Sequence, residues 1–448
     1  MDDKLLSILD SIINKTSKVG VDEIELFAQK KSEKKVFLES NNLKSAISSK
    51  LVGVGIRVIK NNSLGFTSIN SFNESKILEG IKEAIAIAKV TPPEDSNFLP
   101  KKHNITKIPE LYDKSVDIFT MDDLISIGNK CLTQINKIDS RINIESAEFR
   151  AAKLETAIIN SNGIEISETK SSFSWEIAGM AIDGNDIGSW DFVADSIVKA
   201  KEIDIEANVE IFARKVLENL NAKKTDSFVG TMVLSPDAAF DLLSIVIDSA
   251  SAYPIQQGGS YLQDKLGDQI ATDNFTIVDN GSQQNSSSSS SFDREGLPRK
   301  ELKIINNGIF TGILYNTITA KKENLESTGH ASGDFRNIPE INPTNILISS
   351  GNKSLDDIIS EIVHGIYVKR VSTSPDYVSG DFSAVLKGSQ LIKKGEIKET
   401  LKEITATGNI YTCLNQITGL SKELHTLRYG YVSFTVPIIA IEKVNFAS

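Results

Sequence analysis

One segment says most about this chain, and it runs Gly230-Thr-Met-Val-Leu-Ser-Pro-Asp-Ala-Ala-Phe-Asp-Leu-Leu-Ser-Ile-Val-Ile-Asp-Ser249. It begins as a strand, turns at a Ser-Pro pair and continues as an amphipathic helix. Apolar residues recur at helical spacing in the second part, so one face of this helix is expected to pack on a core. These residues are Ala239, Leu242, Leu243, Val246 and Ile247.

Further landmarks follow this segment in a defined order. They include Phe292-Asp-Arg-Glu-Gly-Leu-Pro298, the run from Ile304 to Tyr315 with its Asn-Gly turn, and Ser327-Thr-Gly-His-Ala331. The first half contributes Gly53-Val-Gly-Ile-Arg-Val58. In this order the landmarks resemble the TldD/PmbA family, also known as modulators of DNA gyrase or peptidase family U62, across nearly the full chain.

The resemblance makes the helix before Ser249 the place to look for a metal. In metal-bearing members this helix reads Leu-Leu-His-Glu-x-x-x-His, in which two imidazoles bind Zn²⁺ and the glutamate activates a water molecule. Here the matching positions are Ser244, Ile245 and Ser249. The resemblance therefore implies the PmbA-like (TldE-like) branch, with no catalytic residue and no metal in this chain. Zinc is expected only in a TldD-type partner.

Other candidate site residues are expected to line a cleft. The segment Gly380-Asp-Phe-Ser383 matches one beside the family's active-site cleft, so Asp381 and Ser383 are predicted to line a cleft, together with Tyr253. A structural role is an equal alternative, with Gly380 in a turn and Asp381 capping backbone donors.

A metal site elsewhere has little support in the sequence. The four histidines are scattered, and only Glu361 and His364 are spaced to share a helix face. Metal-bearing relatives also use a cysteine from a C-terminal glycine-rich segment. Cys413 lies upstream of that point, on a predicted helix, so we do not assign it this role.

Residues 280–291 form a polar tract that ends in six consecutive serines. Too little apolar surface is present to offset the entropy of ordering, so the tract is predicted to be a flexible loop. No GxSxG motif surrounds the serines, which argues against a nucleophile.

Length, charge and cysteine content limit the remaining possibilities. A chain of 448 residues predicts two domains, taken as residues 1–222 and 223–448. A formal net charge of -10 argues against nucleic acid as the main ligand. Two distant cysteines suit a reducing cytosol, no secretory signal is apparent, and no apolar stretch approaches the ~20 residues of a membrane span. We therefore expect a cytoplasmic protein without a membrane partner.

The fold class predicted is α+β. The first domain is expected to be an antiparallel sheet with helices on one face, and the second a β-rich, barrel-like domain with helices. Helices are predicted at residues 3–18, 73–89, 121–138 and 204–222, and strands at 23–31, 34–41, 46–59, 63–70, 142–151, 154–160, 163–182 and 189–195. Gly53 and Gly55 lack the third glycine and the helix of a nucleotide-binding motif, and are expected to mark a bulge or close contact.

The leading functional hypothesis is a metal-free subunit of a TldD/PmbA-type peptidase, dimeric with itself or with a TldD-type metallopeptidase subunit, acting on unfolded or extended peptides. The first alternative is a stand-alone homodimer that binds peptides without cleaving them. The second is a peptidase with a non-standard metal site.

Overall fold

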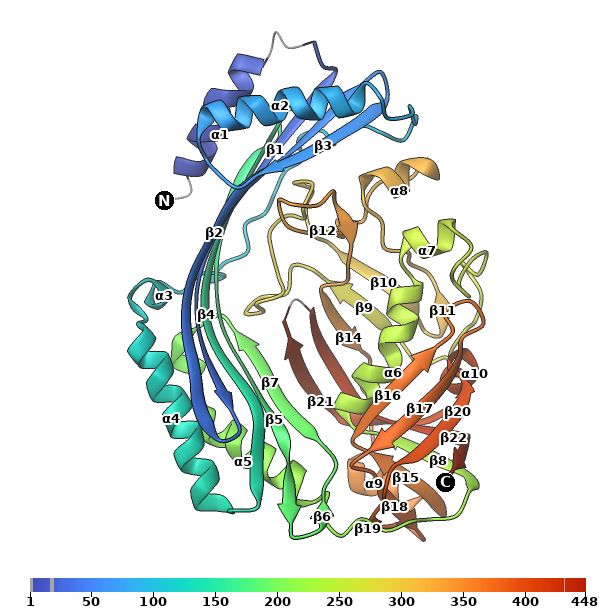
Figure 1. Cartoon of the computed structure of the whole chain (residues 1–448). Helices are drawn as coiled ribbons and strands as arrows, with labels where there is room; N and C mark the ends of the chain where they lie inside the picture. Colours follow the sequence, from blue (N-terminus) through green and yellow to red (C-terminus); the bar gives the residue numbers. More distant parts are fainter. Residues whose placement is uncertain (1–2, 17–19, 431) are drawn as a thin grey trace.

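The structure is a computed structural model that describes residues 3–16, 20–430 and 432–448. Two layers face each other across the molecule (Figure 1). The first half of the chain forms a long curved sheet, and its concave side is turned toward the second half. No helix in these described ranges has the length and apolar character needed to cross a membrane.

The curved sheet is antiparallel, with strand order β3-β2-β1-β4-β5-β6, and β7 also pairs with β5. Its strands are β1 (Glu23–Glu39), β2 (Asn42–Lys60), β3 (Ser63–Ile69), β4 (Ile142–Asn160), β5 (Glu165–Asp183), β6 (Asp186–Ile187) and β7 (Asp191–Ile197). Asn162-Gly163 forms the predicted turn between β4 and β5, where Gly163 has a φ of +91°.

Two of these strands are longer than the sequence suggested. Residues 23–31 and 34–41 were predicted as separate strands, but β1 continues through Ser32 and Glu33. Residues 142–151 and 154–160 likewise form the single strand β4. The polar centre of β1 lacks a clear apolar alternation, but it pairs without interruption with β2 on one side and β4 on the other. Pairing on both sides supplies the backbone hydrogen bonds that keep the strand extended.

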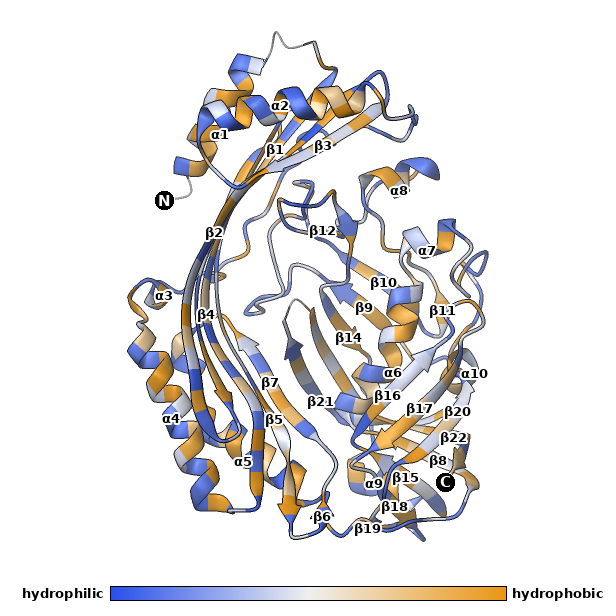
Figure 2. Cartoon of the chain, viewed as in Figure 1, coloured by the Kyte–Doolittle hydropathy of each residue, from blue (hydrophilic) through white to orange (hydrophobic). Residues whose placement is uncertain are grey.

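Helices cover the outer face of the curved sheet in two groups. α1 (Asp3–Thr16) and α2 (Glu74–Ala88) enclose one apolar cluster, and α4 (Met121–Ile138) and α5 (Ile205–Leu217) enclose another. Short turns α3 (Ser115–Ile118) and η1 (Ala200–Glu202) flank the second group. Hydrophobic and hydrophilic residues alternate along α4 and α5, as expected for amphipathic helices (Figure 2).

The second half forms a mixed sheet of thirteen strands. Its central strand, β22 (Val432–Ala447), pairs in parallel with β14 (Asn345–Ile348). It pairs antiparallel with β8 (Phe228–Leu234), β20 (Ile404–Asn409) and β21 (Ile417–Tyr429). The barrel-like domain expected from the sequence is therefore a branched mixed sheet. The α+β fold class itself is confirmed.

The other strands of this half are β9 (Ile277–Asn280), β10 (Glu301–Asn306), β11 (Ile309–Phe310), β12 (Ala331–Ser332), β13 (Glu340–Ile341), β15 (His364–Val368), β16 (Arg370–Pro375), β17 (Asp381–Lys387), β18 (Gln390–Lys393) and β19 (Glu396–Thr400). The helices are α6 (Pro236–Ser249), α7 (Ala252–Gln256), α8 (Thr317–Lys322), α9 (Leu355–Ser360) and α10 (Ile410–Asn415).

The strand, turn and helix predicted around the Ser-Pro pair are confirmed as β8 and α6. Ser235 caps the helix by accepting a hydrogen bond from the backbone N–H of Ala238, and Pro236 occupies the first turn. All five apolar residues singled out in the sequence are buried. The apolar face of α6 thus belongs to the main core of the second half.

Candidate functional site

The three positions of α6 that match the family's metal motif lie on a well-packed helix. Ile245 and Ser249 are only 2% and 1% exposed. Ser249 Oγ donates to the Ile245 carbonyl at 2.7 Å, and Ser244 Oγ donates to the Asp241 carbonyl at 3.0 Å. Both hydroxyl protons are therefore used within the helix, and Ile245 offers only hydrocarbon. These side chains do not form a zinc-binding set.

Two tyrosines close the space beside Ser249. Tyr411 on α10 is 3% exposed, and its ring stacks on Tyr261 with centroids 3.9 Å apart. Burial raises the pKa of the Tyr411 hydroxyl to about 12, while the adjacent Ser249 hydroxyl opposes the shift. Gly380 permits this packing, because a Cβ there would lie 2.6 Å from the Tyr411 ring. Aromatic side chains therefore pack around Ser249, which matches the family's second histidine.

The three residues predicted to line a cleft come from two elements of the second half, α7 and β17. Tyr253 on α7 is 66% exposed, and Asp381 and Ser383 lie exposed on β17. Asp381 accepts a hydrogen bond from the Asn409 side chain at 2.9 Å. None of the three lines the large cavity described below. Their proposed role at a cleft stays a prediction.

The Glu361 and His364 pair does not share a helix face. α9 ends at Ser360, and His364 begins β15. Glu361 pairs with Lys353 at 2.6 Å, whereas His364 stacks on Phe228 at 3.8 Å. Within the described part of the chain, no group of three or more His, Cys, Asp or Glu residues could hold a metal ion.

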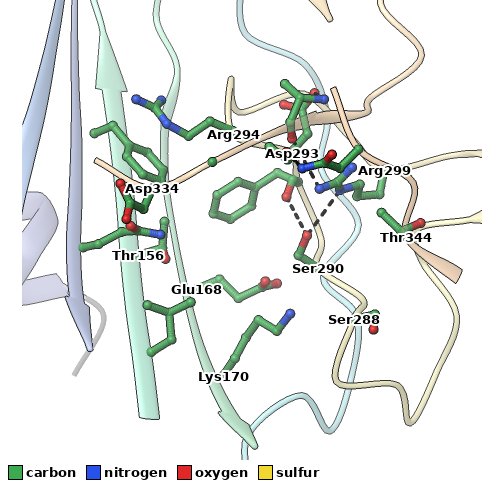
Figure 3. A pocket seen from close by; sticks show the side chains of 18 of the residues that line it. Thr156, Glu168, Lys170, Ser288, Ser290, Asp293, Arg294, Arg299, Asp334 and Thr344 are labelled. Atoms are coloured by element: carbon green, nitrogen blue, oxygen red, sulfur yellow. Dashed lines mark hydrogen bonds between the residues drawn. The ribbon is translucent and has the colours of Figure 1, made fainter. Parts of the chain in front are cut away.

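A cavity of about 460 Å³ lies between the concave face of the curved sheet and loops of the second half (Figure 3). Alternate residues of the strands point into it, because side chains of a strand alternate between its two faces. From the sheet these are Phe27, Gln29 and Lys31 on β1, Leu51 on β2, Leu154 and Thr156 on β4, and Glu168 and Lys170 on β5. A volume of this size is within the range of small-ligand pockets, about 300–1,000 Å³.

The opposite wall includes the serine tract, Ser286 to Ser291, which is ordered and partly buried. Ser286, Ser289 and Ser291 are each no more than 5% exposed. Ser286 Oγ donates to the Asn345 side chain at 2.6 Å, and the Ser291 amide donates to Glu168 at 2.9 Å. The predicted flexible loop is therefore wrong. Hydrogen bonds to distant strands supply the stabilisation that apolar burial does not, and small hydroxyl side chains fit the narrow space.

Charged side chains cross this cavity from both walls. Lys170 extends from β5 and donates to the Ser289 carbonyl, and Arg299 Nε donates to Ser290 Oγ at 3.4 Å (Figure 3). Burial lowers the pKa of the Lys170 amine to about 8; Glu168 opposes this shift and Arg299 adds to it. Burial and the carboxylate of Glu295 raise the pKa of Asp293 to about 7.

A buried ionic cluster beside the cavity joins the two halves. Arg57 on β2 bonds Glu25 at 2.7 Å and Glu295 at 2.8 Å, and Arg294 bonds Glu25 at 3.0 Å. The Arg294 guanidinium also lies 3.5 Å from the centre of the Phe27 ring. Arg57 belongs to the Gly53–Val58 landmark, and Arg294 and Glu295 to the Phe292–Pro298 landmark. The two landmarks were visible in the sequence, but nothing there indicated that they meet.

Gly53 and Gly55 also serve this contact between the halves. A Cβ on Gly53 would lie 2.0 Å from the Phe335 ring, and one on Gly55 would lie 2.6 Å from the Phe335 carbonyl oxygen. The close contact expected for these glycines is therefore confirmed, and its partner is a loop of the second half.

Comparisons with known proteins agree with the fold and the landmarks. The PmbA/TldA metallopeptidase C-terminal domain matches residues 229–448, and PmbA/TldA metallopeptidase domain 1 matches residues 24–88. An uncharacterized protein of Methanocaldococcus jannaschii is 29% identical over 90% of this chain and 92% of its own length. Metalloprotease PmbA of Escherichia coli O157:H7 is 24% identical over 83% of this chain and 81% of its own.

A solved structure shows the same fold over the whole chain. The crystal structure of TldE from Thermococcus kodakarensis superimposes with a TM-score of 0.91 at 24% identity and covers 98% of this chain and 100% of its own. The two domain matches include both the Gly53–Val58 and the Phe292–Pro298 landmarks, whose meeting builds the ionic cluster. On these two domain matches the chain belongs to the PmbA/TldD family of metallopeptidase-related proteins.

Proposed function

We propose that this chain is a metal-free, PmbA/TldE-like subunit of a TldD/PmbA-type peptidase complex that acts on unfolded or extended peptides. One observation carries the proposal: the motif positions on α6 hold Ser244, Ile245 and Ser249, with the last two buried. A catalytic zinc site needs three protein ligands and an open position for water. In this proposal both the zinc and the general base come from a partner with the His-Glu-x-x-x-His helix.

Exposed apolar residues near the end of α6 support the contact with a partner. Tyr253, Tyr377 and Val378 are 66%, 40% and 58% exposed. The backbone N–H of Tyr261 donates to the Tyr377 carbonyl at 2.8 Å, which ties the loop of Tyr377 and Val378 to the aromatic stack beside Ser249. Exposed aromatic and aliphatic groups of this kind are typical of protein interfaces. We propose that these exposed residues form the dimer contact, with either a like or an unlike chain.

The test measures zinc content and peptide cleavage for the pure chain, for a TldD-type chain from the same cell and for their mixture. We expect zinc far below stoichiometry in the pure chain and faster cleavage in the mixture than in the TldD-type chain alone. The matched control is a TldD-type chain whose motif glutamate is changed to glutamine, which should leave assembly intact and remove cleavage. Stoichiometric zinc with chelator-sensitive cleavage by the pure chain would overturn the proposal.

A stand-alone homodimer that binds peptides without cleaving them is the second candidate. The cavity between the two halves favours it, since binding there needs no metal. Two results together would support this candidate. The pure chain would bind peptide, and the mixture would cleave peptide no faster than the TldD-type chain alone. If instead the pure chain proves to be a zinc enzyme, the non-standard site is tested with Glu361→Gln and His364→Gln.

A further inference from the structure

We infer that the cavity between the curved sheet and the serine tract binds the free C-terminal carboxylate of a short peptide whose last side chain is apolar. The inference rests on the proposed function only in taking a peptide as the ligand. The cavity lies between two halves of one chain and is separate from α6, so ligand binding there can be measured without a partner.

The charge of the lining favours an anion. Five cationic side chains line the cavity, namely Lys31, Lys170, Arg294, Arg299 and Arg336, against the three acidic ones Glu168, Asp293 and Asp334. Glu25 pairs with Arg294 at 3.0 Å and Glu33 with Lys31 at 2.8 Å, so Lys170 and Arg299 are the cations that we expect to attract a ligand. Positive charge concentrated in a low-dielectric recess attracts and orients an anionic group. Carboxylates are bound best where cations and hydroxyl donors converge.

Some buried polar atoms in the cavity lining also lack a hydrogen-bond partner among the described residues. Ser288 Oγ and the Nε and Nη2 atoms of Arg294 are buried and make no hydrogen bond to any described residue. Burial without a partner is costly for polar groups, so such atoms call for an explanation. Ser288 lies on the same wall as Ser289, whose carbonyl accepts from Lys170. A carboxylate held near Lys170 would give this wall its missing acceptor.

The curved-sheet wall of the cavity explains the preference for an apolar last side chain. Phe27, Leu51 and Leu154 line the cavity from three neighbouring strands. The ligand therefore meets hydrocarbon from β1, β2 and β4, and it meets polar groups from the serine tract, Arg299 and Lys170 of β5, as in many small-ligand sites. The exposed residues Arg336 and Asn337 lie at the rim, where the ligand enters.

The experiment uses isothermal titration calorimetry on the full chain. The probe is the tripeptide Gly-Gly-Leu with a free carboxylate, and the comparison ligands are its C-terminal amide, Gly-Gly-Ser, acetate and inorganic phosphate. Lys170→Gln removes the buried charge, and Lys50→Gln is the matched control, since Lys50 is exposed on the same sheet and outside the cavity. Leu51→Trp fills the apolar side as a second, independent variant. Circular dichroism checks that each variant is folded.

We expect Gly-Gly-Leu to bind about tenfold or more tightly than its amide, because a hydrogen bond to a charged group contributes at least that factor. K170Q and L51W should each weaken binding of the free acid by a similar factor, and K50Q should leave it unchanged. Equal binding of acid and amide, or unchanged binding in folded K170Q, would overturn the inference. Binding of phosphate or acetate as tight as the peptide would show an anion site that does not recognise peptides, which also overturns it.

The pH profile provides a readout that a structural role would not affect. Burial lowers the pKa of Lys170 to about 8, and burial beside Glu295 raises the pKa of Asp293 to about 7. Glu168, Arg294 and Arg299 face the same cavity. Affinity should therefore fall as the pH rises, with the upper part of the fall absent in K170Q. If no peptide binds but the mixture with a TldD-type chain cleaves, this inference fails while the proposed function stands.

Discussion

Replacing Arg57 with methionine should destabilise the protein more than any substitution at a surface ion pair. Arg57 is 1% exposed, and its partners Glu25 and Glu295 are both 0% exposed. The change removes one guanidinium from two buried carboxylates. Glu25 keeps Arg294 at 3.0 Å, and Glu295 keeps the Thr317 amide at 2.7 Å. Breaking a buried pair by removing one partner costs about 3–5 kcal/mol, a large fraction of a typical stability of about 5–15 kcal/mol.

The assay is urea unfolding followed by circular dichroism and tryptophan fluorescence. Arg141→Met is the matched control, because Arg141 also bridges two carboxylates, Asp139 and Asp183, but is 41% exposed. Surface pairs contribute little, so R141M should leave the unfolding midpoint nearly unchanged. If folded R57M unfolds at the same urea concentration as R141M, the cluster does not hold the two halves together and the reasoning is refuted.

The same cluster predicts a dependence on acid. Burial alone raises the pKa of Glu25, but the charges of Arg57 and Arg294 outweigh it and hold the pKa below its ordinary value. A lowered folded-state pKa means that the stabilisation is complete above the unfolded-state pKa and is lost as the pH falls through the folded-state value. The wild type should therefore lose stability in acid more steeply than R57M, as measured by urea midpoints over a pH series.

Three further predictions concern packing, thiols and helix capping. Gly53→Ala places a Cβ 2.0 Å from the Phe335 ring and should cost about 1–3 kcal/mol in urea unfolding; if Phe335→Leu does not relieve the loss, the clash is not its cause. Burial raises the pKa of Cys131 and Cys413 to about 12, so a disulfide reagent should label them only after unfolding, and rapid labelling of native protein would contradict their burial. Ser235→Ala removes the cap of α6 and should lower stability by about 1 kcal/mol, whereas Ser235→Asp should not.

Local pattern was sufficient to find most helices and turns. The helix at residues 121–138 was predicted to the residue, because its apolar spacing and its Thr120 cap are both local signals. The helix expected at residues 3–18 is described over Asp3–Thr16, and the rest of it lies outside the described residues. Gly163 likewise marked its turn, since a positive φ is a property of the residue itself.

Predictions failed where long-range pairing decides the conformation. The polar centre of β1 gives no strand pattern, and the serine tract contains too little apolar surface to indicate order. Both are ordered because distant segments satisfy their hydrogen bonds, as Asn345 does for Ser286 across 59 residues. A sequence read along one strand does not reveal these partners.

The sequence by itself determined the family resemblance, the α+β class and the absence of imidazoles on α6, because each depends on residue identity and short-range spacing. Only the tertiary structure decided that Arg57 and Glu295, 238 residues apart, form one buried cluster, and that Lys170 contacts the serine tract beside a cavity. Such contacts arise when the two halves close on one another. Removing water from these charges and hydroxyls costs free energy, and only the ion pairs and hydrogen bonds formed when the distant segments meet offset that cost.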